Sequence, residues 1–464
     1  MKSTVVDETK LEENVPGSKR WTVGTLTYTT GGLAVLFCWL LWGDFAWSMR
    51  ERSVPSVIQL LFKKYDASDM VTGLLIGSLP AALAMLIGPI ISYKSDRHRS
   101  RWGRRIPFLL IPTPIAVLAM VGLAFSPQLG EWLHELPALK GWGLNVSILL
   151  SLGLFWTLFE FASIIANSVF GGLVNDVVPQ PVLGRFFGLF RALSLIAGII
   201  FNFWMLGKAE THFVEIFIGI GLLYGVGFTV MCLKVKEGTY PPPPDEPLPG
   251  SAGGFFSAAK VYFRDCFGHS YYLWFFGVMS LCAIAGSPVN LFSVFYARSV
   301  KMSMGDYGTC LALTYLISLV LAYPLGALAD RFHPLRVSLV AMGLYVLTSL
   351  WGGLYADNAR NFGIVFVVHG VLMGTYFTAS ASLAQKLLPR QRFAELNSAC
   401  GILISVTSIV VPPSIGLLLD QSGHVYRYTF YAGAGISVVA LVCGGVLYRK
   451  FMALGGPSGY RPPE

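Results

Sequence analysis

Charged residues are scarce in this chain, and their scarcity indicates to which class of protein, soluble or membrane, it belongs. Only 13% of the 464 residues are Asp, Glu, Lys or Arg, whereas 54% are hydrophobic. Soluble domains carry roughly 25% charged residues, so the composition predicts an integral membrane protein. The formal net charge of +9 does not indicate nucleic-acid binding, because the basic residues occupy loops at alternate membrane crossings rather than one exposed face.

Cysteines are few and scattered, and enzyme motifs are missing. Of the seven cysteines, five lie inside apolar runs, which suits neither a disulfide framework nor a metal site. We therefore expect no metal and no cofactor. Residues 1–20 lack the apolar core of a signal peptide, so we expect no cleavage. The sequence has neither a phosphate-cradling glycine loop nor a nucleophile–base grouping, so it predicts a protein that is neither ATP-driven nor an enzyme.

The chain contains many long apolar runs, and each of them is long enough to cross a bilayer. They predict an all-α membrane protein with twelve transmembrane helices, near 30–62, 70–93, 106–126, 145–174, 184–206, 212–234, 270–297, 305–328, 336–356, 361–387, 394–418 and 426–449. Four consecutive prolines, Pro241 to Pro244, cannot continue a helix and mark the midpoint.

The chain therefore divides into two six-helix halves. We expect a cytoplasmic N-terminal tail (1–29), an N-terminal six-helix bundle (30–234), a cytoplasmic linker (235–269), a C-terminal six-helix bundle (270–449) and a cytoplasmic tail (450–464). Residues 255–267 have an amphipathic pattern, with Lys260 and Arg264 near Phe256, Val261 and Phe263, which predicts an interfacial helix in the linker.

The distribution of Lys and Arg predicts the orientation. An even number of helices puts both termini on one side, and that side carries about three times as many Lys and Arg residues as the other. Positive short loops remain in the cytoplasm. We therefore expect both termini to be cytoplasmic and the protein to lie in the plasma (inner) membrane.

A dense cationic turn, residues 94–105, lies between the second and third runs. It contains Asp96 among six cations, which indicates a cytoplasmic gate latch rather than a topology anchor alone. A weaker copy recurs at residues 326–336, and two Pro/Arg turns, 175–186 and 385–393, occupy corresponding places in the two halves. Such duplication suggests a transporter. The predicted gate residues are Asp96, Arg97, Arg101, Arg104, Arg105, Asp176, Arg185, Asp330 and Arg331.

On these residues the chain resembles the major facilitator superfamily over nearly its whole length. The segment from Ser95 to Phe108 is similar to the basic loop of the glycoside-pentoside-hexuronide cation symporters and of the plant sucrose-proton symporters. The resemblance implies the major facilitator fold: two pseudo-symmetric six-helix bundles around a central cavity that opens alternately to each side.

The resemblance also suggests a proton-coupling acid. Glu160 lies sixteen residues before Asp176, where the sucrose symporters carry an acidic residue in helix 4 that is taken to bind the coupling proton. Melibiose-type relatives use aspartates on helix 2 for sodium, and the span 70–91 contains no acid. We therefore expect coupling to protons rather than sodium, with Arg191 of the next helix as the neighbour of Glu160.

The first helix carries four charges at bilayer depth, where each costs roughly 2.5–3.5 kcal/mol, so they must pair or line water. Asp44, Ser48 and Glu51 share one helical face, which Arg52 borders. Carboxylates accept hydrogen bonds from sugar hydroxyls and aromatic rings can stack on sugars. The expected substrate-binding residues are Asp44, Trp47, Ser48, Glu51, Arg52, Trp156, Asn167, Asn290, His369, Tyr376 and Asn397.

Together these patterns predict a proton-coupled symporter of a small sugar or glycoside, monomeric in the bilayer. A neutral substrate is favoured, because the two acids of the first helix balance its two arginines and Glu160 balances Arg191. One alternative is a hexuronide carrier, since Arg50, Arg52 and Arg191 could hold a carboxylate. Another is a non-transport protein of the same fold, such as a pigment-assembly factor or a sensor.

Overall fold

Twelve apolar helical spans dominate the structure, a computed structural model that describes residues 20–137, 140–240, 262–389 and 392–463. Each span has the length and composition needed to cross a membrane, which confirms the predicted all-α membrane fold. The spans begin and end within several residues of the predicted bounds. The chain is therefore an integral, multi-pass membrane protein.

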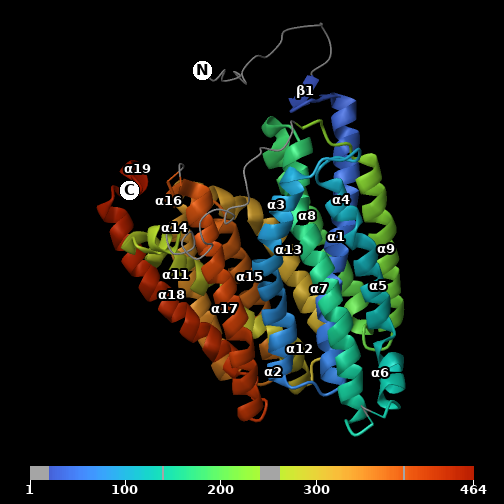
Figure 1. Cartoon of the computed structure of the whole chain (residues 1–464). Coiled ribbons are helices and arrows are strands. Elements are labelled where there is room, and N and C mark those ends of the chain that lie inside the picture. Colours follow the sequence, from blue (N-terminus) through green and yellow to red (C-terminus); the bar gives the residue numbers. More distant parts are fainter. Residues whose placement is uncertain (1–19, 138–139, 241–261, 390–391, 464) are drawn as a thin grey trace.

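The elements of the first half follow one another in an up-and-down order (Figure 1). They are β1 (Arg20–Val23), β2 (Leu26–Thr29), α1 (Thr30–Lys64), α2 (Asp69–Thr72), the π-helix η1 (Gly73–Ser78), α3 (Leu79–Arg97), α4 (Ile106–Leu110), α5 (Pro112–Ala124), α6 (Ser126–His134), α7 (Leu144–Val177), α8 (Gln180–Ile200), the π-helix η2 (Phe201–Met205), the 3₁₀ turn η3 (Leu206–Lys208) and α9 (Phe213–Lys234). The segment from α2 to α3 forms one membrane span, as does that from α8 to η3.

The second half repeats this arrangement. Its elements are α11 (Ser270–Ile284), α12 (Ser287–Ser299), α13 (Met304–Phe332), α14 (Pro334–Tyr355), α15 (Ala359–Ser380), α16 (Leu383–Leu387), α17 (Phe393–Gln421), α18 (Tyr428–Ala453) and α19 (Gly456–Gly459). The break between α11 and α12 falls where Gly286 and Pro288 predict a kink. Residues 262–267 are helical. The rest of the predicted interfacial helix lies outside the described residues.

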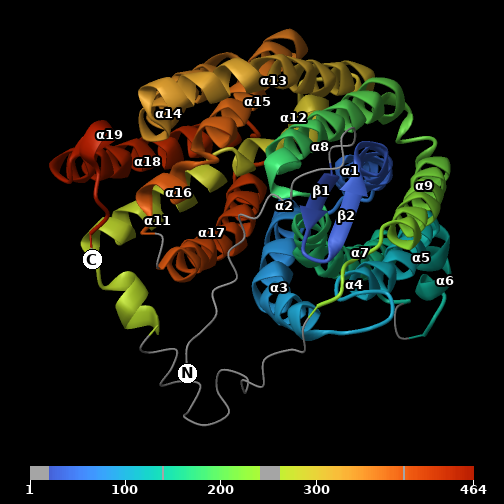
Figure 2. The same ribbon diagram turned by 90° about the horizontal axis from the view of Figure 1, so that it is seen from above.

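The helices pack as two bundles. Helices α1 to α9 pack mainly on one another, and α11 to α18 do the same; we call these groups the N-terminal and C-terminal bundles (Figure 2). The start of α1, with the hairpin before it, and the end of α18 lie at the same end of the bundles (Figure 1). We call this the termini end and the opposite one the far end.

A small antiparallel hairpin precedes α1 in a segment that we expected to be a plain tail. Strands β1 and β2 pair with Val23 opposite Leu26, and Gly24 adopts a φ of +54° in the turn. Each strand has only four residues, too few for alternation to stand out in the sequence. The hairpin contacts the segment after α9, since Thr239 N donates to Thr25 Oγ1 at 2.9 Å.

Two seams of close helix packing join the bundles. One lies between α2–η1 and α17, where a Cβ atom at Gly416 would collide with the carbonyl oxygen of Asp69. The other lies between the α8–η3 span and α13, where a Cβ atom at Gly308 would collide with the carbonyl oxygen of Asn202. Glycine is required at both positions because the backbones touch.

Candidate functional site

A cavity of about 750 Å³ lies between the two bundles. Residues of α1, α8, α12, α13 and α15 line it: Arg52, Ser56, Gln59, Arg191, Leu195, Asn290, Ser293, Tyr307, Leu311, Thr314, Tyr315, Ser318, Ala322, Phe366, Gly370, Met373, Gly374, Phe377 and Thr378, together with Ala381. A chamber of about 390 Å³ adjoins it and shares Gln59, Asn290, Met373 and Phe377. Among the residues that the structure describes, the wall therefore offers hydroxyls, amides and two guanidinium groups and includes no carboxylate.

The two arginines of the wall keep their charge available to the cavity. Arg52 donates from Nη2 to Ser194 Oγ at 3.2 Å, and its guanidinium carbon lies 5.2 Å from the centre of the Tyr315 ring. Arg52 Nε is buried without a hydrogen-bond partner, and the Arg191 side chain is exposed. Among the described residues, neither arginine forms an ion pair within 4.0 Å.

The acids near this cavity lie beside the wall rather than in it. Glu51 is exposed on α1 and acts electrostatically on Arg52 and Arg191. Glu160 of α7 is partly exposed, and the charged groups that act on it are Arg50 and Glu51. We expected Arg191 to be the neighbour of Glu160, but the structure gives this role to Arg50.

Arg50 itself is enclosed by aromatic rings. Its side chain is 2% exposed, and its guanidinium carbon lies 4.3 Å from the centre of the Trp47 ring, 4.5 Å from that of Tyr224 and 5.3 Å from that of Phe159. Such cation–π contacts stabilise a buried cation. The Nε and Nη1 atoms have no hydrogen-bond partner. The sequence analysis names Arg50 only for the hexuronide alternative, because helical spacing places it away from the polar face of α1.

Several predicted substrate-binding residues are core residues of one bundle. Asp44 is fully buried and accepts a hydrogen bond from Ser48 Oγ at 3.4 Å. Trp47 stacks on Phe170 with ring centres 5.4 Å apart, and Trp156 Nε1 donates to the carbonyl oxygen of Leu75 at 2.7 Å. Neither tryptophan lines the cavity, because their large apolar faces are buried in helix packing instead.

Of the predicted substrate-binding residues in the second half, some lie at the cavity and others lie away from it. Asn290 lines the cavity, and His369 lies behind it with Nε2 3.0 Å from Asn290 Oδ1. Tyr376 is buried and its hydroxyl points to Met279 Sδ at 3.9 Å. Asn397, like Asn167 in the first half, is exposed and outside the cavity wall. His369 therefore orients Asn290 rather than facing the cavity itself.

Some wall residues escaped the sequence analysis although a signal for them exists. Ser56 and Gln59 follow Arg52 at intervals of four and three residues, so all three lie on one face of α1. Tyr307 reaches Ser293, with the two hydroxyl oxygens 2.7 Å apart. Extending the polar face of α1 beyond Arg52 would have found the first two. The Tyr307–Ser293 pair joins different helices and leaves no sequence signal.

The cationic turn forms an ion-pair network at the termini end. Arg104 binds Asp176 through two hydrogen bonds, of 2.6 and 2.9 Å, and Arg105 Nε lies 3.1 Å from Asp176 Oδ2. Arg105 also lies 2.5 Å from Asp96. All four residues belong to the N-terminal bundle, so in this conformation the network fastens the turn to the end of α7.

A carboxylate that the sequence analysis missed completes this network. Glu237 accepts hydrogen bonds from the backbone N–H groups of Arg104, Arg105 and Ile106 at 2.8 to 2.9 Å. It therefore caps the N-terminus of α4, where an anion is favoured. The backbone of Gly103 has a φ of +104°, and a Cβ atom there would collide with this carboxylate.

The other predicted gate residues make weaker contacts. Asp330 pairs with Lys386 at 3.3 Å, and both side chains are exposed. Arg97 lies over the Tyr93 ring at 3.8 Å, Arg101 lies 5.8 Å from the Trp102 ring, and Arg331 lies 5.3 Å from the Phe332 ring. Arg185 is exposed.

A second polar cluster, absent from the sequence analysis, joins the two bundles at the far end. Asp420 accepts hydrogen bonds from the backbone N–H groups of Asp69 and Met70, both at 2.9 Å. The Asp69 carboxylate in turn contacts His424 Nδ1 at 2.7 Å and the Tyr426 hydroxyl at 3.2 Å. Asp69, Asp420 and His424 are close enough together to hold a metal ion, but their oxygens already accept these hydrogen bonds.

Comparison with known proteins agrees with this architecture. Residues 273–457 match the sequence model of the Major Facilitator Superfamily. An uncharacterized MFS-type transporter of Mycobacterium tuberculosis is 29% identical over 30% of this chain and 24% of its own length. Monocarboxylate transporter 6 of Homo sapiens is 24% identical over 94% of this chain and 82% of its own length. The first curated relatives are matched over only a quarter to two fifths of their length.

Solved structures extend the likeness to the whole chain. The inward-facing, unoccupied structure of a bacterial homolog of the human lysosomal transporter Spinster superposes with a TM-score of 0.64 at 14% identity, covering 91% of this chain and 97% of that one. At this identity the likeness concerns the fold. The chain is therefore similar in fold over most of its length, and in sequence over its second half, to proteins of the Major Facilitator Superfamily.

Proposed function

We propose that the protein is a secondary active transporter that carries a small, hydroxylated organic anion, of the hexuronide class, through the cavity between its bundles. The observation that carries this proposal is the composition of the cavity wall. Arg52 and Arg191 line it, and no carboxylate does so in the described part of the chain. Guanidinium groups bind carboxylates through charge-assisted, often bidentate hydrogen bonds.

The sequence analysis favoured a neutral glycoside as substrate, whereas this proposal favours an anionic one. The charge balance that favoured a neutral glycoside assumed that Asp44 and Glu160 face the same space as the arginines. Asp44 is fully buried, and Glu160 has Arg50 as its cationic neighbour. Glu51 acts on both Arg52 and Arg191, and the buried Asp44 also acts on Arg52. Neither acid lies in the wall as the described residues form it, so the wall itself carries an excess of positive charge that an anion would neutralise.

The remainder of the wall suits a hydroxylated molecule. Hydroxyl and amide groups of Ser56, Gln59, Asn290 and Tyr315 face the cavity and can both donate to and accept from substrate hydroxyls. A volume of about 750 Å³ falls in the range of small-molecule sites. The likeness to a human protein named monocarboxylate transporter is in keeping with an anionic substrate.

Proton coupling is the second part of the proposal. Glu160 faces two competing influences, the cation of Arg50 and the anion of Glu51, so its charge state depends on how these groups are placed in each conformation. A protonated Glu160 would no longer offset the charge of Arg50, so the net positive charge beside the cavity would rise and an anionic substrate would bind together with the proton. This assignment to Glu160 also follows from the resemblance to the sucrose-proton symporters.

Alternating access requires interactions that close one end at a time. The hydrogen bonds between the described residues of the two bundles lie toward the far end, so the structure corresponds to the conformer that is closed there. Transport would break these contacts and form a matching set at the termini end. A pigment-assembly factor or a sensor would have no need for two unpaired arginines in a central cavity.

Uptake and competition in proteoliposomes test this function. We expect an imposed proton gradient to drive accumulation of a labelled uronide, and unlabelled uronides to compete at least tenfold better than the matched neutral glycosides. Replacing Arg191→Gln should reduce uronide binding about tenfold or more, since a charged hydrogen bond contributes roughly 1.5–3 kcal/mol. The control is Arg449→Gln, which removes an exposed cation outside the cavity. Better competition by neutral glycosides would refute the anionic assignment, and the absence of any uptake would refute transport.

A further inference from the structure

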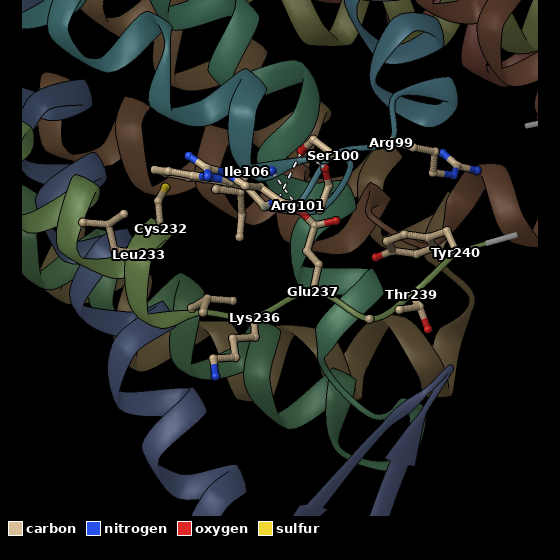
Figure 3. Close-up of a pocket in the computed structure, with 14 residues that line it drawn as sticks. Arg99, Ser100, Arg101, Ile106, Cys232, Leu233, Lys236, Glu237, Thr239 and Tyr240 are labelled. Carbon is tan, nitrogen blue, oxygen red and sulfur yellow. Dashed lines mark hydrogen bonds between the residues drawn. The ribbon is translucent and has the colours of Figure 1, made fainter. Parts of the chain in front are cut away.

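A second large pocket, outside the cavity between the bundles, opens at the termini end (Figure 3). Its volume is about 900 Å³, and it is lined by the cationic turn, residues 99–103 with Ile106, and by the segment 232–240 that ends α9 and follows it. We call it the loop pocket. It contributes nothing to the transport route proposed above, so its chemistry calls for an explanation of its own.

The loop pocket combines two kinds of surface. Arg99, Arg101 and Lys236 supply positive charge, whereas Ile106, Cys232, Leu233 and Val235 supply apolar surface. Figure 3 shows Cys232, Leu233 and Lys236 on one side of the pocket, Arg99, Thr239 and Tyr240 on the other, and Glu237 between them. A ligand that fits this pocket is therefore amphiphilic, with an anionic and an apolar part.

The one carboxylate of the pocket does not cancel this charge. Both oxygens of Glu237 accept hydrogen bonds from the N-terminus of α4, so its charge is already offset by the backbone there. Arg101 and Lys236 are exposed, and neither forms an ion pair with a carboxylate in the part of the chain that the structure describes. Their two positive charges remain available to a ligand.

The position of the loop pocket identifies the source of such a ligand. One membrane span begins at Ile106 and another ends at Lys234, so the pocket lies at the level where lipid headgroups meet the protein. Trp102 and Leu233 are 42% and 54% exposed, and tryptophan is enriched at this interface. Basic residues just outside membrane spans attract anionic lipids.

We propose that the loop pocket binds an anionic phospholipid, with its phosphate between Arg101 and Lys236 and the start of its acyl chains on Trp102 and Leu233. A lipid bound in this way would contact both the cationic turn and the end of α9. It would thereby hold together two segments that the Glu237 cap already joins. The headgroup chemistry alone would also suit a free phosphate, and the apolar floor favours the lipid.

Native mass spectrometry of the purified full chain tests the proposal, with phosphatidylglycerol and phosphatidylcholine of the same acyl chains as probes. We expect phosphatidylglycerol to bind at least tenfold more tightly. The double variant Arg101→Gln, Lys236→Gln should bind it about 30-fold more weakly, because each basic residue contributes about 1 kcal/mol, equivalent to about fivefold in affinity. The same variant should lose the rise in unfolding temperature that phosphatidylglycerol gives the unaltered chain.

The matched control is Arg449→Gln with Arg461→Gln, which removes the same charge from two exposed positions near the end of α18, away from the pocket. Its affinity for phosphatidylglycerol should stay within twofold of the unaltered chain. An equal loss in the control would show that net charge alone attracts the lipid, and equal binding of the two lipids would refute an anionic site. Displacement of the lipid by equimolar inorganic phosphate would assign the pocket to a free anion instead.

Discussion

At the far end the two bundles are bonded to each other, whereas at the termini end the charged residues bond within their own bundle. Asp420 of α17 caps the N-terminus of α2, and Arg298 of α12 pairs with Glu210 of the other bundle. At the termini end, Asp176 binds Arg104 and Arg105 of the same bundle. The density of charge in a loop therefore does not reveal whether that loop joins the bundles.

Stabilising one bundle and joining the two bundles are separate roles, and the sequence analysis assigned both to the cationic turn. The cationic turn was expected to latch the cytoplasmic face. In this conformation its ion pairs with Asp176 hold the turn against α7, and the latch stays a prediction for the conformer that is closed at the termini end. Under the proposed function, the contacts that would break when the far end opens are those of Asp420 and Asp69, which use backbone N–H groups and single side chains.

The largest effect should come from the pairs inside the N-terminal bundle. Replacing Asp176→Asn removes the carboxylate that serves two arginines, and its side chain is only 13% exposed. Breaking a partly buried ion pair from one side costs about 3 kcal/mol. We expect a clearly lower thermal unfolding temperature in detergent. An unfolding temperature equal to that of the unaltered chain would show that the turn is held by other contacts.

A smaller effect is expected at the far end, on conformation rather than stability. Replacing Asp420→Asn removes the charge that caps α2, which contributes about 1 kcal/mol, equivalent to about a fivefold larger population opened at the far end. A cysteine placed at Gln59 should then react faster with a membrane-impermeant reagent applied from that side.

The control for this experiment is Glu215→Gln, which removes an exposed acid near the far end of α9. It should leave the labelling rate unchanged. If both substitutions accelerate labelling equally, surface charge explains the result, and the Asp420 contact does not keep the far end closed.

The smallest effect should be found at the termini end of the C-terminal bundle. Asp330 and Lys386 are 78% and 38% exposed, and exposed pairs contribute about 0–1 kcal/mol. Asp330→Asn should therefore change the unfolding temperature far less than Asp176→Asn. Comparable losses from the two substitutions would mean that the weaker copy of the cationic turn is as important to its bundle as the stronger one.

The sequence predicted those parts of the molecule that depend on local patterns. Apolar runs determine the twelve spans, and Gly286 with Pro288 predicts the break between α11 and α12. The assignments of Asp44 and Trp47 did not agree with the structure, because helical spacing shows which residues share a face but not which neighbour covers that face. Glu237 and Asp420 escaped notice because their partners are backbone groups more than a hundred residues away.

The aromatic enclosure of Arg50 has a consequence for the way the chain enters the membrane. Three further charges, Asp44, Glu51 and Arg52, lie on the same helix, and each charge costs roughly 2.5–3.5 kcal/mol at bilayer depth. Two of the rings around Arg50, those of Phe159 and Tyr224, belong to α7 and α9, which are synthesised long after α1. Helix α1 is therefore left without these two aromatic neighbours of Arg50 until α9 has been made.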